Sequence, residues 1–429
     1  MSGRFTLRFA FVAAFLMTLN AAGNLFADGI LRDGIGAIST GRGGTNLGFA
    51  DNGNIIADNP GALVNVSGSG LFELDFDLFI TDLSYSDADN AETSAENDPF
   101  PLGQISYIRK SADGNFAYGF GAFSQAGFAT EYTLNGNGPF AGPQEYNSIG
   151  ALIRILPSIS VALTPRLSVG GTLGLAINHI ELEGPYFTQA DTPFRGTPTI
   201  LDLQATGTGL SWSLGLQYLL TPNTTLGMSF QAETRITSGG SARSFVPGLG
   251  SSNFDAELET QWPATFGIGI AHKASRTLKL AADVIWTRWS DSNQSFDLLF
   301  TEPSNPVFAA VLGPAFPETL PLDWSDSVSL RLGAEKSLGG GRVARVGYVY
   351  HPNPIPSETL TPYIQAIVEH SISAGYGWQI GASSIDFAYQ VMLGDDQSVG
   401  TSAFAGGDFD NSTSSVSAHW FSASLTRRF

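Results

Sequence analysis

Residues 71–80 read LFELDFDLFI, and the alternation within this stretch decides the fold class. Every second side chain is apolar, namely Phe72, Leu74, Phe76, Leu78 and Ile80. The opposite face carries three carboxylates, Glu73, Asp75 and Asp77. A β-strand that separates hydrocarbon from a wet interior needs this period of two. One strand of a soluble sheet would also be amphipathic, so the connections between the strands have to distinguish a membrane barrel from a soluble sheet.

The same pattern predicts fourteen strands, and the connections between them alternate strictly between short and long. The first strand begins at residue 69, and the others are expected at 102–110, 115–129, 146–163, 166–181, 208–220, 224–237, 256–271, 277–290, 326–337, 342–351, 370–380, 384–393 and 416–429. Short turns occupy 111–114, 164–165, 221–223, 273–276, 339–341 and 381–383, and long loops occupy 84–101, 130–145, 182–207, 238–255, 291–325, 352–369 and 394–415. Short periplasmic turns and long external loops are typical of bacterial outer-membrane barrels. We therefore expect an all-β protein, a 14-stranded antiparallel transmembrane β-barrel in the outer membrane.

Composition agrees with this fold and excludes several functions. Charged residues form 14% of the 429 residues, against roughly 25% in ordinary soluble domains. Mean hydropathy is only +0.06, which excludes a bundle of membrane-spanning helices. The net charge of −18 argues against a nucleic-acid partner, because phosphates need a basic surface. The chain has no cysteine, no His-Glu-x-x-His spacing and no Gly-x-Ser-x-Gly elbow, so we expect neither an enzyme nor a metal or cofactor site.

The N-terminus has the pattern of a secretory signal. Arg4 and Arg8 accompany an apolar run from Phe9 to Leu19, and small residues follow up to Ala27. We assign residues 1–27 to the signal peptide, with cleavage after Gly23 or Ala27. Residues 28–68 are rich in glycine and show no sustained period, so they are expected to form a compact irregular segment ahead of the barrel at 69–429.

The C-terminus ends in Phe429, with Leu425, Ala423 and Phe421 on the same strand face. This resembles the signal by which the barrel assembly machinery receives outer-membrane barrels, although Arg427 interrupts the apolar stripe.

Residues 34–63 resemble the N-terminal hatch of the FadL/TodX-type family of long-chain fatty acid and aromatic hydrocarbon (toluene) transporters. The features that carry the resemblance are Gly41-Arg42-Gly43-Gly44 and Asn59-Pro60-Gly61-Ala62, where the family usually reads Asn-Pro-Ala. Further matches are Trp262-Pro263 and the stretch from Trp324 through Arg331 to Gly347-Tyr348. The resemblance implies a fourteen-strand barrel whose lumen is plugged by the hatch, with Gly41, Arg42, Gly43, Gly44, Asn59, Pro60 and Gly61 as hatch residues.

Alternation also predicts charged side chains in the lumen. They are Asp283, Arg331, Glu335, Arg345 and Asp386, each opposite apolar neighbours on its strand. Two roles are open: a salt-bridge lattice that holds the hatch, or an Arg that binds a ligand carboxylate.

Two further groups are candidates for the path of a ligand. Gly119, Gly121, Phe123 and Gly127 lie on the third strand, where glycine permits a kink. The resemblance implies that such a kink opens the wall sideways, but these glycines could equally make room for the hatch. The external loops hold Tyr186, Phe187, Phe194, Phe245, Val246 and Phe254. By resemblance they form a capture groove, and the alternative is simple packing of the loops on each other.

These observations predict a monomeric channel for passive uptake of hydrophobic small molecules, with contacts to outer-membrane lipid and lipopolysaccharide. Whether the cargo is a fatty acid, an alkane or an aromatic hydrocarbon stays open at this point. A structural or adhesive surface barrel and a general polar porin are the alternative functions.

Overall fold

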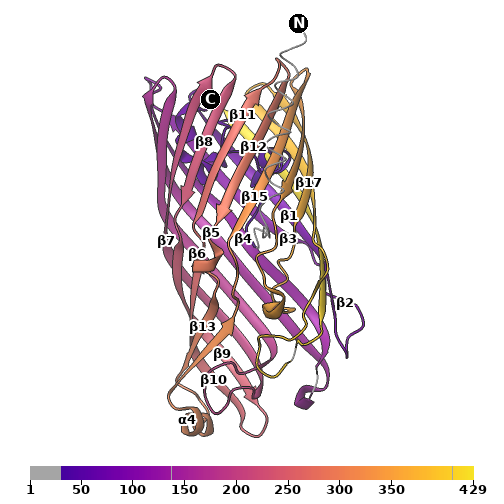
Figure 1. Cartoon of the computed structure of the whole chain (residues 1–429). Coiled ribbons are helices and arrows are strands. Elements are labelled where there is room, and N and C mark those ends of the chain that lie inside the picture. Colours follow the sequence, from indigo (N-terminus) through magenta and orange to yellow (C-terminus); the bar gives the residue numbers. More distant parts are fainter. Residues whose placement is uncertain (1–29, 137, 408) are drawn as a thin grey trace.

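The computed structural model describes residues 30–136, 138–407 and 409–429. The predicted signal peptide therefore lies outside the described residues. Fourteen antiparallel strands form one closed barrel, as predicted (Figure 1). Ten of them are continuous: β1 (Gly70–Ser86), β3 (Phe100–Lys110), β4 (Phe116–Gly136), β5 (Gly142–Thr164), β6 (Leu167–Phe187), β7 (Pro198–Thr221), β16 (Arg342–Tyr350), β17 (His370–Ile380), β18 (Ser383–Leu393) and β20 (Thr413–Arg428).

The other four strands are each interrupted once. They are β8 (Thr224–Gln231) with β9 (Thr234–Val246), β10 (Gly250–Trp262) with β11 (Thr265–Lys273), β12 (Leu278–Thr287) with β13 (Ser295–Thr301), and β14 (Ala315–Pro321) with β15 (Ser327–Gly339). Two short strands, β2 (Thr93–Ser94) and β19 (Gln397–Ser398), pair with the ends of β1 and β20 that lie away from the short turns. The ring closes where β1 pairs with β20, from Leu71 opposite Arg428 to Ser86 opposite Thr413.

The alternation along β1 is the one predicted. Phe76 is 55% exposed on the outer face, whereas Glu73 and Asp77 are fully buried inside. Among the helices of the described residues, none has the length and hydropathy needed to cross a bilayer.

Several strands are longer than predicted, and this corrects four of the expected loops. Residues 130–145, 182–207 and 238–255 mostly continue the strands β4 to β7, β9 and β10 beyond the expected boundaries, and residues 291–325 contain the added strand segments β13 and β14. The sequence hides these extensions because the outward face becomes polar once a strand leaves hydrocarbon. The short helices η3 (Gly138–Phe140), η4 (Trp289–Asp291), α4 (Pro306–Leu312) and η5 (Ser357–Thr359) lie in the remaining connections.

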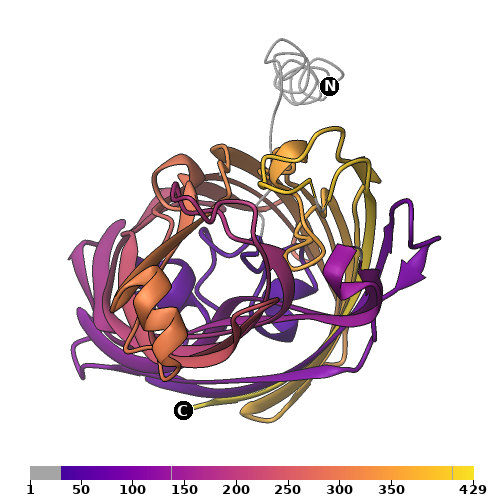
Figure 2. The same ribbon diagram turned by 90° about the horizontal axis from the view of Figure 1, so that it is seen from below.

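The segment ahead of β1 lies inside the barrel, where a view along the axis shows it within the ring of strands (Figure 2). It contains α2 (Gly36–Thr40), α3 (Ile55–Asp58) and the 3-10 helix η2 (Pro60–Asn65). Its buried side chains, including Ile55, Ile56 and Leu63, form one apolar cluster with Phe123 and Leu156 of the wall. Residues 30–69 are called the hatch below.

Candidate functional site

The hatch docks on the wall through Asn59. Its Oδ1 accepts a hydrogen bond from Gly61 N (3.1 Å), which caps η2. Its Nδ2 donates to the carbonyl of Leu47 (2.8 Å) in the hatch and to the carbonyl of Leu216 (3.0 Å) on β7. A Cβ atom on Gly61 would lie 2.7 Å from the backbone of Gly215, so the helix turn rests directly on the wall.

The glycine run that follows α2 makes a tight turn. Gly43 and Gly44 have φ of +66° and +68°, in the left-handed region where L side chains are strained. A Cβ atom on Gly44 would overlap the carbonyl oxygen of Asp33. Gly43 N donates to Ser373 Oγ on β17 (3.1 Å), which ties this turn to the wall.

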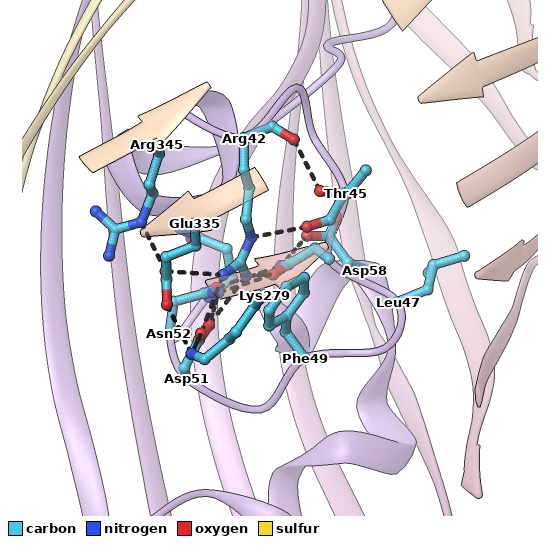
Figure 3. Close-up of polar contacts among 12 residues, drawn as sticks. Arg42, Thr45, Leu47, Phe49, Asp51, Asn52, Asp58, Lys279, Glu335 and Arg345 are labelled. Atoms are coloured by element: carbon cyan, nitrogen blue, oxygen red, sulfur yellow. Dashed lines mark hydrogen bonds and ion pairs between the residues drawn. The ribbon is translucent and has the colours of Figure 1, made fainter. Parts of the chain in front are cut away.

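Arg42 lies at the centre of the hatch, fully buried (Figure 3). Its Nε donates to the carbonyl of Thr45 (2.8 Å), and its Nη1 and Nη2 hold Asp51 in a bidentate pair at 3.0 and 2.9 Å. The guanidinium stacks 3.5 Å from the ring centre of Phe49. Burial alone would raise the pKa of Asp51, but Arg42 and then Lys279 outweigh it and hold that pKa well below its usual range.

Three of the five predicted lumen charges converge on this cluster. Glu335 accepts from Lys279 Nζ (2.6 Å) and Arg345 Nε (2.9 Å), and lies 3.7 Å from Arg42 Nη1 (Figure 3). Arg345 also donates through Nη1 to Asp386 (2.7 Å). Arg42, Lys279 and Arg345 thus face Asp51, Glu335 and Asp386, so the cluster balances its charges across hatch and wall.

The other two predicted lumen charges contact the hatch elsewhere. Asp283 Oδ2 accepts from the backbone N–H groups of Asn46 (2.8 Å) and Leu47 (3.1 Å). Arg331 donates to the carbonyl of Asp33. All five predicted residues therefore touch the hatch or an ion pair that holds it.

Asp33 fixes the start of the hatch to the wall. Its Oδ2 accepts from Ser371 Oγ (2.7 Å) and Gln390 Nε2 (3.0 Å), and lies 3.3 Å from His351 Nε2. Burial raises the pKa of Asp33, but the neighbouring His351 outweighs it and brings the pKa below its usual range.

The third barrel strand, β4, is bulged at Gln125. Ser124 faces Ile153 and Ala126 faces Leu152, so Gln125 is the extra residue. Pairing between β3 and β4 ends where Ile105 faces Ala122, although both strands continue.

The hatch takes up part of this unpaired edge. Arg32 N donates to the Gln125 carbonyl (3.2 Å), and Gly127 N donates to the Ile30 carbonyl (3.1 Å). The side chain of Arg32 donates to the Ser124 carbonyl (3.0 Å), pairs with Asp77 and lies 4.2 Å over the ring of Trp420.

The predicted kink residues fall on both sides of the bulge. A Cβ atom on Gly119 would lie 3.1 Å from Ile56 of the hatch, and one on Gly121 would overlap the ring of Phe123. These two glycines therefore make room for packed side chains, and Phe123 is part of the hatch cluster. Gly127 lies past the bulge and lines the cavity described next.

An apolar cavity of about 450 Å³ lies between the start of the hatch and the bulge. Its lining includes Leu31, Phe128, Val368 and Met392 in the interior. Residues 100–103 of β3, beside the unpaired edge, also line it.

Arg154 was not predicted as a site residue. It lies on β5 and is 5% exposed, and its Nη1 donates to Gln125 Oε1 (2.6 Å). Within the part of the chain that the structure describes, no carboxylate lies within ion-pair distance of Arg154. It lines a polar cavity of about 110 Å³ that shares Leu31 and Arg32 with the apolar one. Its alternation with the apolar neighbours Ile153 and Ile155 was the signal that could have placed it in the lumen.

The residues predicted for an external capture groove come together only in part. Tyr186 and Phe187 line an apolar cavity of about 60 Å³, together with Phe128. Val246 and Phe254 belong to a buried cluster against which Tyr186 also packs, and Phe245 lies near Phe140, with the ring centres 6.3 Å apart and the rings tilted. Phe194 lies in the connection after β6, where its carbonyl accepts from Thr188.

The described residues contain no group of three or more His, Cys, Asp or Glu side chains arranged to hold a metal ion.

A family model matches residues 21–429, and its description reads outer membrane protein transport protein (OMPP1/FadL/TodX). No curated protein sequence matches the chain. Among solved structures, a FadL homologue from Pseudomonas aeruginosa is 16% identical, with 94% of this chain and 100% of that chain covered and a TM-score of 0.74. The toluene transporter TodX of Pseudomonas putida is 21% identical, with 95% and 100% covered and a TM-score of 0.75. The toluene transporter TbuX of Ralstonia pickettii is 20% identical, with 92% and 99% covered and a TM-score of 0.71. At these identities the structural likeness shows the fold.

Proposed function

This chain belongs to the outer membrane protein transport protein family (OMPP1/FadL/TodX), and from that premise we propose that it lets hydrophobic small molecules cross the outer membrane passively. The cargo enters from the external side, passes through the apolar cavity beside the hatch and leaves sideways between β3 and β4. The route needs no cofactor and no catalytic step, because the cargo moves down its own concentration gradient.

The observation that carries this proposal is the 450 Å³ apolar cavity at the bulge. Ligand sites are concave and mostly apolar, and the volume of this cavity lies in the lower part of their usual range of about 300–1,000 Å³. Its lining reaches the β3 residues that have lost their β4 partners. A cargo in this cavity would meet the hydrocarbon of the bilayer before it met water, which supports sideways release.

The hatch contacts support a plugged channel. The wall holds the hatch by ion pairs, by Asn59 and by the bonds of Asp33. A water-filled pore would offer a hydrophobic solute no favourable binding site, whereas a plugged barrel with an apolar cavity provides one.

For the cargo, two chemical classes have support. TodX and TbuX are described as toluene transporters, which favours a hydrocarbon. Arg154 favours an amphipathic acid, because a buried guanidinium without a carboxylate partner is suited to bind one from a ligand.

The capture groove and the assembly route remain part of the proposal. Tyr186 and Phe187 are the candidates for first contact with the cargo, since they line the external apolar cavity. The protein is expected to work as a monomer that the barrel assembly machinery inserts.

Uptake by proteoliposomes tests the function. Vesicles whose outer leaflet is lipopolysaccharide, which resists apolar solutes, should take up radiolabelled oleate or toluene faster with the purified protein than without it. In planar bilayers the protein should show little steady ion current. Large steady currents without selective uptake would favour a polar porin, and neither current nor uptake would favour a structural or adhesive barrel.

A further inference from the structure

The two ends of the barrel carry opposite charge on their outer surfaces. In the six short turns, at 111–115, 165–166, 222–223, 274–277, 340–341 and 381–382, the only acidic side chain is Asp113. The opposite ends of the strands carry exposed carboxylates, such as Asp202 on β7 and Glu257 and Glu259 on β10. Because the whole chain has a net charge of −18, a basic surface at one end is a local exception.

Six basic side chains lie at the turn end of adjacent parts of the wall, and we call them the basic belt. In order around the barrel they are Arg109 on β3, Arg427 on β20, Arg342 on β16, Lys336 on β15, Arg276 in the turn between β12 and β11, and Lys273 at the end of β11. Strand parity points Lys336 and Arg342 outward, because Glu335 and Arg345 face the lumen.

The belt residues have only neutral or aromatic partners. Lys336 donates to Thr277 Oγ1 (3.0 Å), Arg342 to the carbonyl of Gly339 (3.3 Å) and Arg427 to Ser383 Oγ (3.1 Å). Among the described residues, none of the six forms an ion pair with a carboxylate. Two inward neighbours behave differently: Lys110 and Arg428 donate to carbonyls of the hatch.

Exposed apolar and aromatic side chains lie directly beside the belt. The guanidinium of Arg109 is 5.2 Å from the ring centre of Phe429, which stacks on Tyr107 at 5.7 Å. Trp378, 42% exposed, faces Arg342 across β17 and β16. Aromatic residues mark the level where hydrocarbon meets headgroups, and long basic side chains reach from that level toward phosphate.

We propose that the basic belt binds the anionic headgroups of phospholipids in the leaflet that meets the short turns. Cations that have no protein carboxylate, at the boundary of hydrocarbon and water, attract lipid phosphates and anionic headgroups. The belt spans the β3-to-β11 side of the barrel, and the basic residue in the turns of the remaining wall is Arg166 between β5 and β6. The bound lipids therefore concentrate on the belt side, which includes the β3 edge beside the apolar cavity.

Lipid selectivity in a reconstituted bilayer tests this proposal. The full protein is placed in bilayers of phosphatidylcholine with spin-labelled phosphatidylglycerol or spin-labelled phosphatidylcholine, and the motionally restricted fraction of each probe is measured. The test variant combines Arg109→Gln, Lys336→Gln, Arg342→Gln and Arg427→Gln. The control variant combines Arg235→Gln and Arg243→Gln, two exposed basic residues on β9 at the other end.

The wild type should prefer the phosphatidylglycerol probe severalfold, and added salt should weaken this preference. The test variant should lose the preference, and the control should keep it. A version with Lys at the three Arg positions should also keep it, which separates charge from packing. Equal restriction of both probes in the wild type would overturn the proposal and leave an acidic periplasmic protein as the partner. Undiminished preference in a folded test variant would overturn it as well.

Discussion

Gly61 of the hatch lies so close to Gly215 of β7 that a Cβ atom on Gly61 would be 2.7 Å from the carbonyl carbon and oxygen of Gly215. A Cβ atom on Gly215 would in turn lie 2.7 Å from the backbone nitrogen of Gly61. Moving the backbone on either side would cost free energy, so the two glycines together set the distance between hatch and wall.

Gly61→Ala should therefore loosen the hatch, at a cost of about 1–3 kcal/mol, the usual range for overpacking. Limited proteolysis of the folded barrel in detergent should cut the hatch faster than in the wild type. Gly239→Ala is the matched control, because a Cβ atom there meets nothing within 4 Å. Equal cleavage rates for Gly61→Ala and Gly239→Ala would contradict this account.

Arg42→Met should release the hatch more strongly. It leaves Asp51 and Glu335 without the guanidinium between them, and breaking a buried pair in this way costs about 3–5 kcal/mol. We expect higher ion conductance in planar bilayers, because the lumen is no longer closed. Arg235→Met, on an exposed pair with Glu233, should leave conductance unchanged.

The ion pair between Arg42 and Asp51 also determines how the hatch responds to low pH. Because the pKa of Asp51 is lowered in the folded state, its stabilisation is present above the unfolded pKa of about 3.9 and is lost as pH falls toward the folded value. The wild-type hatch should hold down to pH 4, and the Arg42→Met hatch should already be loose at pH 7. Proteolysis across this range measures the difference, and a wild-type hatch that opened between pH 7 and 5 would disprove it.

Asp58→Asn should stabilise the hatch at neutral pH. Burial raises the pKa of Asp58, and no described cation pairs with its carboxylate. A carboxyl group with a raised folded pKa is most favourable below its unfolded pKa, and its contribution is lost as pH rises through the folded value. Asparagine keeps an oxygen that can accept from Asn46 Nδ2 and carries no charge. Proteolysis of the variant should be slower at pH 7 and no longer increase from pH 4 to 8; faster cleavage at pH 7 would refute the argument.

The barrel could be predicted from the sequence alone because the pattern that indicates it is repeated in many strands. Alternation such as that of Phe76 and Asp77 returns in each strand, and the sorting of short and long connections is independent of any one boundary. The predicted lumen charges also depend only on parity, which a regular strand preserves. Their partners could not be predicted, since Glu335 meets Arg42 only through the folding of the hatch.

The bulge in β4 could not be predicted from the sequence, and the reason is local. One extra residue at Gln125 reverses the parity of β4, so Phe123 and Phe128 both face inward although they are five positions apart. Glycines at 119, 121 and 127 remove the alternation that would have revealed this reversal. The position of the capture residues was missed for a similar reason, because polar strand extensions read as loops.

Deletion of Gln125 should close the side of the barrel. Ile153 and Leu152, the partners of Ser124 and Ala126, are consecutive on β5, so the shortened strand keeps its register. A regular β4 can continue pairing with β3, and the exit for cargo is then lost. Uptake by proteoliposomes should fall to near the level of empty vesicles. Gln125→Ala is the control, since it removes the side chain and retains the bulge, and it should transport well. Full uptake by a folded deletion variant would exclude sideways release.

Arg154→Leu should separate the two classes of cargo. The buried guanidinium has Gln125 as its described side-chain partner, so a ligand carboxylate would gain a charge-assisted bond of about 1.5–3 kcal/mol there. Removing it should lower oleate uptake roughly tenfold or more at limiting substrate, because 1.4 kcal/mol corresponds to a factor of ten. Toluene has no charge and should cross at the wild-type rate. Arg154→Lys should retain part of the oleate uptake, because it keeps the charge without the fork of donors. A parallel loss of both cargoes would assign Arg154 a structural role, and unchanged oleate uptake would show that the acid group is bound elsewhere.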